Sequence, residues 1–231
     1  MNIRVVSLVL IILVFALVSG VLSYSVSSGI PLKEAYNNGK ITVIQETAAG
    51  TVPHQVMITN NASKAVKVKK GDVLASSISQ NLVIAEDKIV ASNSNETVKA
   101  YSLYTTPRAV VGTKLLPVNN INNAVNQVIS SSNPSDSQSA MNAQLEIWII
   151  TSENNLNPYT GEPVAVVENN NMTWSQFRQD IANAKSDVMS SFNVSDDTIK
   201  NLNQTQSNTG QTQSWINNII NQIKKSLGIG Q

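Results

Sequence analysis

Hydrophobic positions follow regular periods along most of the chain, after an uninterrupted apolar run at the N-terminus. Residues 5–22 carry no charge and are preceded by a single basic residue. The run is long for the core of a secretory signal peptide and just long enough to cross a bilayer. Small residues follow, so cleavage could occur after Gly20, Ser23 or Ser25. We therefore predict that residues 1–29 are a signal peptide or a membrane anchor and that the rest of the chain is exported.

Residues 40–106 alternate between apolar and polar side chains in short segments separated by turn residues. Before them, Pro31 and Gly39 are placed to begin and end a short helix. Four segments have the period of strands: 40–46, 54–60, 65–72 and 95–105. Residues 80–92 are expected to form a hairpin-like pair that turns near Asp87. Because turn signals recur about every ten residues, the pattern predicts a small β-sandwich or barrel.

The period becomes helical after Pro117. A first helix is indicated by apolar residues at helical spacing: Ile121, Val125, Val128 and Ile129. Pro134 interrupts this pattern, and Ser135 or Asp136 can cap a second helix. The second helix has its own stripe: Met141, Leu145, Trp148 and Ser152. Residues 146–151 are rich in β-branched side chains, which also suits a strand, but we favour a helix that could relax into extended chain at its end.

The C-terminal part combines a short strand candidate, two helices and a polar segment. Residues 164–168 are expected to be a returning strand. A long helix should begin at Thr173 and Gln176, which have capping-box spacing. The polar segment 193–213 resembles a loose linker. Residues 214–228 form an amphipathic pattern whose apolar face is Trp215, Ile216, Ile219, Ile220, Ile223 and Leu227. Docking on the domain or self-association is its expected use, ahead of membrane-surface binding.

These patterns predict an α+β protein. Its β-sandwich or barrel would be small and antiparallel, and a helical subdomain would follow it. A hydrophobic helix would stand at the N-terminus and an amphipathic helix at the C-terminus. We divide the chain into residues 1–29, the signal peptide or anchor, residues 30–168, the β-sandwich with its helical module, and residues 169–231, a helical tail.

Composition narrows the functional classes. The net charge is +1 and 13% of the 231 residues are charged, so the clustered basic side chains that bind nucleic acid are not expected. The chain has no cysteine, which excludes disulfides, thiolate metal sites and thiol catalysis. The single histidine, His54, is expected at the surface or in a strand. Carboxylates are scattered singly, and Asp196 and Asp197 fit a helix cap. We predict no metal, no cofactor and no enzyme activity.

Two short motifs carry a resemblance to a known family. Residues 98–152 contain "AYSLYTTPRAVVG" and, further on, "AQLEIWIIT". This segment resembles the thioester domain of bacterial surface adhesins, the TQXA type, which has an aromatic–cysteine pair after a strand and a glutamine before an Ile-Trp pair. Tyr101 stands at the aromatic position, Ser102 at the cysteine and Gln144 at the glutamine. Four more positions are in register: Pro107, Gly112, Ile147 and Trp148.

The resemblance implies a site made of Ser102 and Gln144, supported by Tyr101, Ile147 and Trp148. In the family, the cysteine thiolate attacks the glutamine carboxamide, ammonia leaves, and the resulting thioester captures a surface nucleophile. A serine hydroxyl is a far weaker nucleophile and leaving group. The site is therefore expected to be degenerate, with a Ser–Gln ester and an ordinary pair of residues as alternatives. We expect Ser102 to end a strand, Gln144 to lie in the first half of a helix, and their side chains to touch.

Five asparagines begin the acceptor sequence for N-glycosylation: Asn61, Asn95, Asn171, Asn193 and Asn203. About this number is expected by chance in a chain so rich in Asn, Ser and Thr. The motifs permit glycosylation in an exported protein without demonstrating it.

Together these features predict an exported, non-catalytic interaction module of adhesin or envelope type. It would be extracellular or at the cell surface, with a surface protein or glycan as its ligand. Residues 5–22 would hold it to the membrane if they are not cleaved. A structural subunit that assembles through its terminal helices, with residues 214–228 in self-association, remains an alternative.

Overall fold

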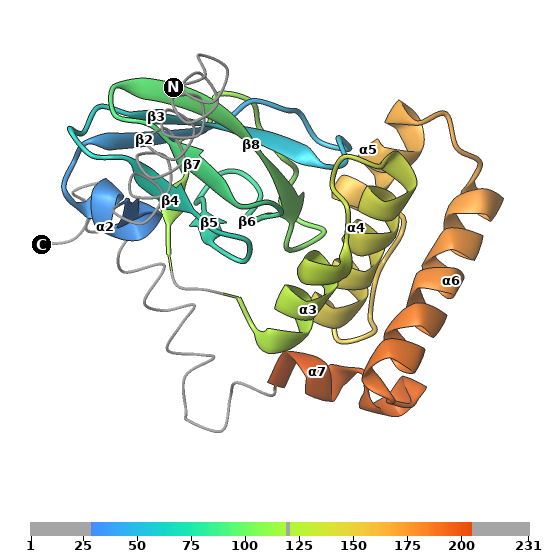
Figure 1. Ribbon diagram of the computed structural model, residues 1–231. Coiled ribbons are helices and arrows are strands. Elements are labelled where there is room, and N and C mark those ends of the chain that lie inside the picture. Colours follow the sequence, from blue (N-terminus) through green and yellow to red (C-terminus); the bar gives the residue numbers. More distant parts are fainter. Residues whose placement is uncertain (1–28, 119–120, 205–231) are drawn as a thin grey trace, which may run out of the picture.

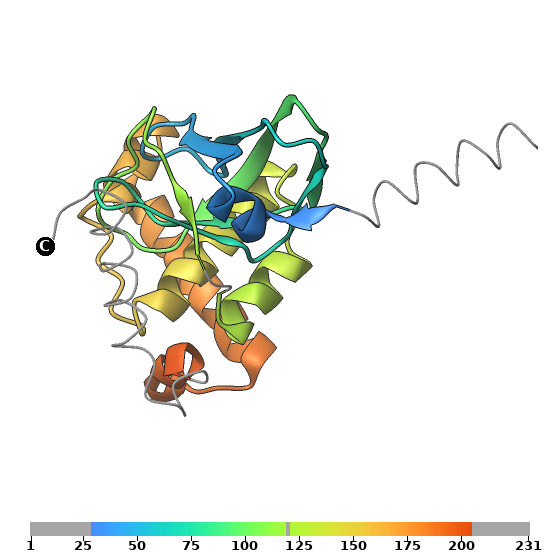
Figure 2. The ribbon, with the colours of Figure 1, turned by 90° about the vertical axis from the view of Figure 1, so that its left-hand side faces the viewer.

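The computed structural model describes residues 29–118 and 121–204, in which a β-region lies beside a group of helices (Figure 1, Figure 2). The strands are β1 (Ile30–Pro31), β2 (Ile41–Gln45), β3 (His54–Asn60), β4 (Val66–Val68), β5 (Val73–Ala75), β6 (Leu82–Ile84), β7 (Lys88–Val90), β8 (Ser94–Ser102) and β9 (Leu116–Pro117). The helices are α2 (Leu32–Asn37), α3 (Asn123–Ser131), α4 (Ser137–Thr151), α5 (Glu162–Asn169), α6 (Trp174–Phe192), the 3₁₀ turn η1 (Asp196–Thr198) and α7 (Lys200–Gln204). The expected α+β class is confirmed.

The β-region is a nearly closed, mostly antiparallel barrel. One sheet has the order β2-β3-β8-β6-β5-β9, and a second has the order β1-β4-β7, in which β1 and β4 are parallel. The outer edge of β2 is hydrogen-bonded to the segment just before β9. Gln45 N donates to Thr113 O (2.9 Å), and Leu115 N donates to Val43 O (2.9 Å). These bonds satisfy the backbone of a strand that would otherwise be an open edge.

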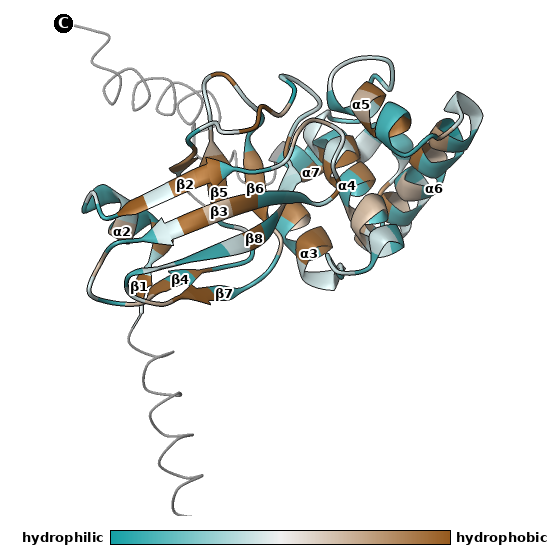
Figure 3. Ribbon diagram, turned by 90° about the horizontal axis from the view of Figure 1, so that it is seen from above, coloured by the Kyte–Doolittle hydropathy of each residue, from teal (hydrophilic) through white to brown (hydrophobic). Residues whose placement is uncertain are grey.

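Two hydrophobic cores share the middle of the larger sheet. On β2 and β3 buried residues alternate with more exposed ones, and both strands have strongly apolar stretches (Figure 3). On β5 and β6 every residue is buried. Leu74 and Leu82 face the barrel interior, whereas Val73 and Val83 pack against the helices. Strands covered on both faces lose the alternation that identifies a strand, which is why β5 could not be predicted.

Helix α4 lies between the sheet and α6, with α3 at its side (Figure 1). Asp136 caps it by accepting from Ser139 N (2.8 Å), as predicted. The predicted capping box of Thr173 and Gln176 opens α6. Residues 146–151 are helical, because Ile147, Trp148, Ile149 and Ile150 are all buried between the sheet and the outer helices. Tertiary burial therefore outweighs their β propensity.

Three local predictions are wrong. Residues 80–92 are not a hairpin, since β6 pairs with β5 and β8 whereas β7 pairs with β4. Residues 164–168 belong to α5, which has Pro163 in its first turn and packs Val166 and Val167 into the helical core. The segment 193–204 contains η1 and α7 rather than a loose linker.

The terminal predictions lie largely outside the described residues. The apolar run 5–22 and the amphipathic pattern 214–228 are in parts of the chain that the structure does not describe. Within residues 29–118 and 121–204, no helix combines the length and apolar character needed to cross a membrane.

Candidate functional site

The candidate site lies where β8 ends against α4. Ser102 is the last residue of β8, as predicted, and Gln144 is at the middle of α4. Both are fully buried. The Gln144 carboxamide makes two bonds with the main chain of Ser102: Oε1 accepts from Ser102 N (2.8 Å) and Nε2 donates to Ser102 O (2.7 Å). The two residues are in contact, but through the main chain of Ser102; the predicted contact between their side chains is not among the hydrogen bonds of the described residues.

The strand register explains why a carboxamide fits there. Lys99 on β8 accepts from Ala85 N, and Leu103, just after β8, donates to Asn81 O, so these odd-numbered residues direct their peptide groups toward the β6 side. Ser102 therefore directs its N–H and C=O toward the β3 side. Strand β3 begins at His54, opposite Ala100, and offers no strand residue opposite Ser102. The Gln144 carboxamide offers a carbonyl oxygen and an N–H side by side, as a peptide group does, and so supplies the missing hydrogen bonds.

The hydroxyl of Ser102 has other partners. Ser102 Oγ donates to Tyr104 O (2.8 Å), and Trp148 Nε1 donates to the same carbonyl (3.1 Å) and lies 3.4 Å from Ser102 Oγ. Thr151 Oγ1 donates to Leu103 O (2.6 Å). The chain leaving β8 is thus bonded to one face of α4 by three side chains, Gln144, Trp148 and Thr151. The Ser102 hydroxyl and the Gln144 carboxamide therefore each have hydrogen-bond partners, and neither bonds the other.

The supporting motif residues surround this junction. Tyr101, Ile147 and Trp148 are buried in the same hydrophobic cluster. The Tyr101 hydroxyl donates to Ser132 Oγ (3.2 Å). Burial raises the pKa of Tyr101, although the bond to Ser132 opposes the rise. A neutral phenol in this position contributes packing and one hydrogen bond rather than a base for Ser102.

A second polar cluster lies nearby, and sequence reasoning missed it. His54 was expected at the surface or in a strand. It lies on β3 and is only 1% exposed. Its Nδ1 is 3.1 Å from Thr47 Oγ1, and its Nε2 is 3.7 Å from Glu162 Oε2, an electrostatic contact longer than a hydrogen bond. Both ring nitrogens therefore face groups other than the Ser102 hydroxyl.

Glu162, the first residue of α5, connects three segments of the chain. Its carboxylate accepts from Gly50 N (2.8 Å) in the β2–β3 loop and from Ala109 N in the β8–β9 loop. Burial alone would raise the pKa of Glu162, but His54 and the two backbone donors outweigh burial and hold the pKa below its usual value. His54 and Glu162 are 108 positions apart in the numbering, and neither belongs to a recognisable motif.

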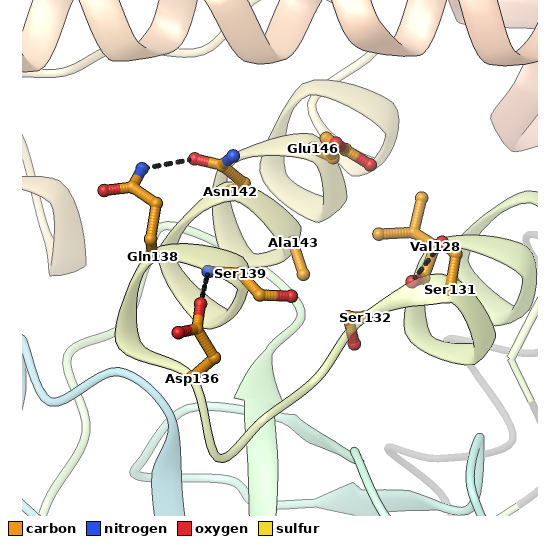
Figure 4. Close-up of a pocket in the computed structure, with 9 residues that line it drawn as sticks. All are labelled: Val128, Ser131, Ser132, Asp136, Gln138, Ser139, Asn142, Ala143 and Glu146. Carbon is orange, nitrogen blue, oxygen red and sulfur yellow. Dashed lines mark hydrogen bonds between the residues drawn. The ribbon is translucent and has the colours of Figure 1, made fainter.

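An open pocket of about 380 Å³ lies on the other side of α4, between α4 and α3 (Figure 4). Its wall is polar and includes Ser131, Ser139, Asn142 and Glu146. Burial, with a smaller contribution from Asp187 on α6, raises the pKa of Glu146 to about 7. No group of three His, Asp or Glu side chains within the described ranges could hold a metal ion. The pocket is separate from the Ser102 junction.

The glycosylation motifs differ in accessibility. Four of the five acceptor asparagines are exposed: Asn61, Asn95, Asn171 and Asn193. Asn203 is half-buried, and its amide bonds Asn122 and Glu153. A glycan on Asn203 would break the latter bond, so the exposed four are the better acceptors.

Comparisons of this chain with protein-family models, with curated proteins and with solved structures found no match. The site is therefore interpreted from its geometry and from the two motifs alone.

Proposed function

We propose that the chain is an exported, non-catalytic interaction module of adhesin or envelope type, with a degenerate thioester-like site at Ser102 and Gln144. The bonding of the Gln144 carboxamide to the end of β8 is the observation that supports this most directly. Two motifs 42 residues apart meet at one buried junction, as a thioester-like arrangement requires. The apolar run 5–22 supports export.

The chemistry at the junction favours a structural role. Thioester formation needs a thiolate that attacks the carboxamide carbon and later serves as a leaving group. Ser102 offers a hydroxyl that donates to Tyr104 O, and the described side chains place no base on it. Gln144 bonds backbone groups through both its carbonyl oxygen and its amide nitrogen. The pair would persist because losing Gln144 would leave two buried backbone groups without partners.

The decisive experiment restores the missing sulfur. In Ser102→Cys, the thiol would lie at a junction that already holds the glutamine, and proximity supplies much of what such a reaction needs. We expect the intact mass of the variant to fall by one ammonia and methylamine to add to it. The wild-type chain should keep its full sequence mass and gain no adduct, whereas a Ser–Gln ester would lower the wild-type mass by the same ammonia.

Matched variants separate the site from general reactivity. Ser132→Cys places a thiol at a half-buried position beside Tyr101, where no glutamine bonds the residue, and it should keep a free thiol. The double variant Ser102→Cys with Gln144→Ala should lose the reaction. If Ser102→Cys folds and stays a free thiol, the vestigial-site proposal is wrong.

Export is tested by fractionation. The full chain should be recovered with membranes or as a processed form, and residues 30–231 alone should be soluble. Intact full-length chain in the cytosol would contradict the extracellular role. This outcome is independent of the mass measurement, so the two parts of the proposal can fail separately.

A further inference from the structure

An aromatic pair is displayed at the surface of the helical region, away from the Ser102 junction. Tyr159 lies in the α4–α5 connection and is 54% exposed, and Trp174 is the half-buried first residue of α6. Their ring centroids are 5.0 Å apart at 45°. Trp174 also makes an edge contact with the fully buried Phe177, with centroids 6.4 Å apart at 74°. The pair is therefore fixed to the core while part of its surface faces solvent.

A cation accompanies the two rings. Arg178 is one helical turn after Trp174, and its NH1 donates to the Tyr159 hydroxyl (3.0 Å). Within the described residues no carboxylate forms an ion pair with this exposed guanidinium. A guanidinium has five N–H donors in a fork that matches a carboxylate, and only one of them is used here. The phenol holds the side chain in place without neutralising its charge.

Polar groups border the rings. Asn157 Oδ1 accepts from Tyr159 N (3.0 Å), which fixes the turn that presents the tyrosine, and the Asn157 side-chain N–H donors remain directed to no described partner. The surface thus combines an exposed tyrosine ring, a half-buried tryptophan ring, one unneutralised cation and a side-chain amide whose N–H groups have no described partner. A protein interface of ordinary size involves some 20–30 residues on each side, far more than this cluster provides. Its size and chemistry fit a single ring-shaped ligand unit.

We propose that Tyr159, Trp174 and Arg178 bind an acidic sugar, a pyranose unit that carries a carboxylate. The apolar C–H face of the sugar packs on the aromatic pair, the carboxylate binds the free fork of Arg178, and a ring hydroxyl accepts from the Asn157 amide. Charge complementarity selects this ligand over a neutral sugar, because a neutral sugar brings no anion to the guanidinium. The site does not depend on Ser102 or Gln144, and its test can fail while the mass measurement above succeeds.

The test uses the full chain in detergent and trigalacturonate as the probe, with maltotriose as the neutral control. Isothermal titration should give a Kd of roughly 0.1–1 mM for trigalacturonate and binding at least about tenfold weaker for maltotriose. Saturation transfer should reach the C–H protons of the sugar. Arg178→Gln should weaken trigalacturonate binding about tenfold or more and leave maltotriose unchanged, whereas Tyr159→Ala should weaken both.

Control variants keep the proposal falsifiable. Lys64→Gln removes an exposed cation from the β3–β4 loop of the barrel, and it should leave binding unchanged. Trp174→Phe keeps an aromatic ring should Trp174→Ala fail to fold, and it should bind more weakly than the wild-type chain. The proposal is wrong if trigalacturonate does not bind, or if Arg178→Gln binds it as well as the wild-type chain. Tighter Arg178-dependent binding of hexaglutamate would assign the surface to an acidic peptide and also overturn the proposal.

Discussion

Replacing Gln144 with methionine tests the rung that this side chain adds to the end of β8. Methionine has a similar length and no amide, so the volume of the site is nearly kept while both bonds to Ser102 are lost. Ser102 N and Ser102 O would then be buried without partners, since β3 begins opposite Ala100 and does not reach them. Each unsatisfied buried backbone group costs about 1–3 kcal/mol, so losing both bonds should lower the free energy of unfolding by about 2–6 kcal/mol.

The assay is equilibrium denaturation in urea of the chain from residue 30 onward, followed by circular dichroism. Gln138→Met is the matched control: it makes the same chemical change on the same helix at an exposed position, where the amide bonds only the half-buried Asn142, and it should stay within about 0.5 kcal/mol of the wild-type chain. A Gln144→Met variant as stable as Gln138→Met would refute the role assigned to this carboxamide.

Gln144→Glu separates the donor half of the rung from the acceptor half. An ionised carboxylate cannot donate to Ser102 O, which lies 2.7 Å from the present Nε2, whereas a protonated carboxyl can. Folding should therefore raise the pKa of the introduced group. The variant should be most stable below the unfolded pKa of glutamate, about 4.3, and should lose stability as the pH rises through the higher folded value. A stability curve parallel to that of the wild-type chain would contradict this.

Three further predictions concern other buried groups. Folding lowers the pKa of Glu162, so ionised Glu162 stabilises the fold above the unfolded pKa, and this stabilisation is lost as the pH falls through the folded pKa. In urea titrations from pH 7 to pH 3, the free energy of unfolding should therefore fall less in Glu162→Gln than in the wild-type chain. The pKa of Glu146 is instead raised to about 7, so its ionised form destabilises the fold at high pH. Glu146→Gln should therefore raise the free energy of unfolding at pH 8 by about 1–2 kcal/mol, a figure that allows for its partial solvation, with no gain at pH 4. Gly50→Ala should cost more than about 3 kcal/mol in thermal or urea unfolding, because φ is +79° and a Cβ would lie 2.3 Å from the Ala165 carbonyl, whereas Gly39→Ala, at φ +70° in open space, should cost about 1–2 kcal/mol.

The sequence predicts those strands and helices that are buried on one side only, because their apolar residues then recur with a regular period. Strands β2, β3, β4 and β8 alternate and were located, and α3 and α6 have helical spacing and caps. Strand β5 was missed because the sheet there is covered on both sides. The α5 segment contains Val164, Val166 and Val167 and was interpreted as a strand; only its packing against the helical core explains why it is helical.

The candidate site divides in the same way. The family resemblance placed Ser102 and Gln144 near one another, but short motifs do not specify which atoms meet. That Gln144 bonds the Ser102 main chain follows from where β3 begins, which is a property of the whole sheet. His54 and Glu162 gave no signal, because a buried contact between residues so distant in the chain has no spacing pattern.

The position of Glu162 has a consequence for the order in which the molecule can be completed. The β2–β3 and β8–β9 loops bind a carboxylate that is made 112 residues after Gly50 and 53 residues after Ala109. A chain that emerges from a ribosome or a translocation channel N-terminus first would form its strands while these loops still lack their anchor. Nascent chains that end before residue 162 should therefore be cut by proteases in both loops, and chains that extend through α5 should resist. The two loops of the barrel are thus fixed only after the first residue of helix α5 has been synthesised.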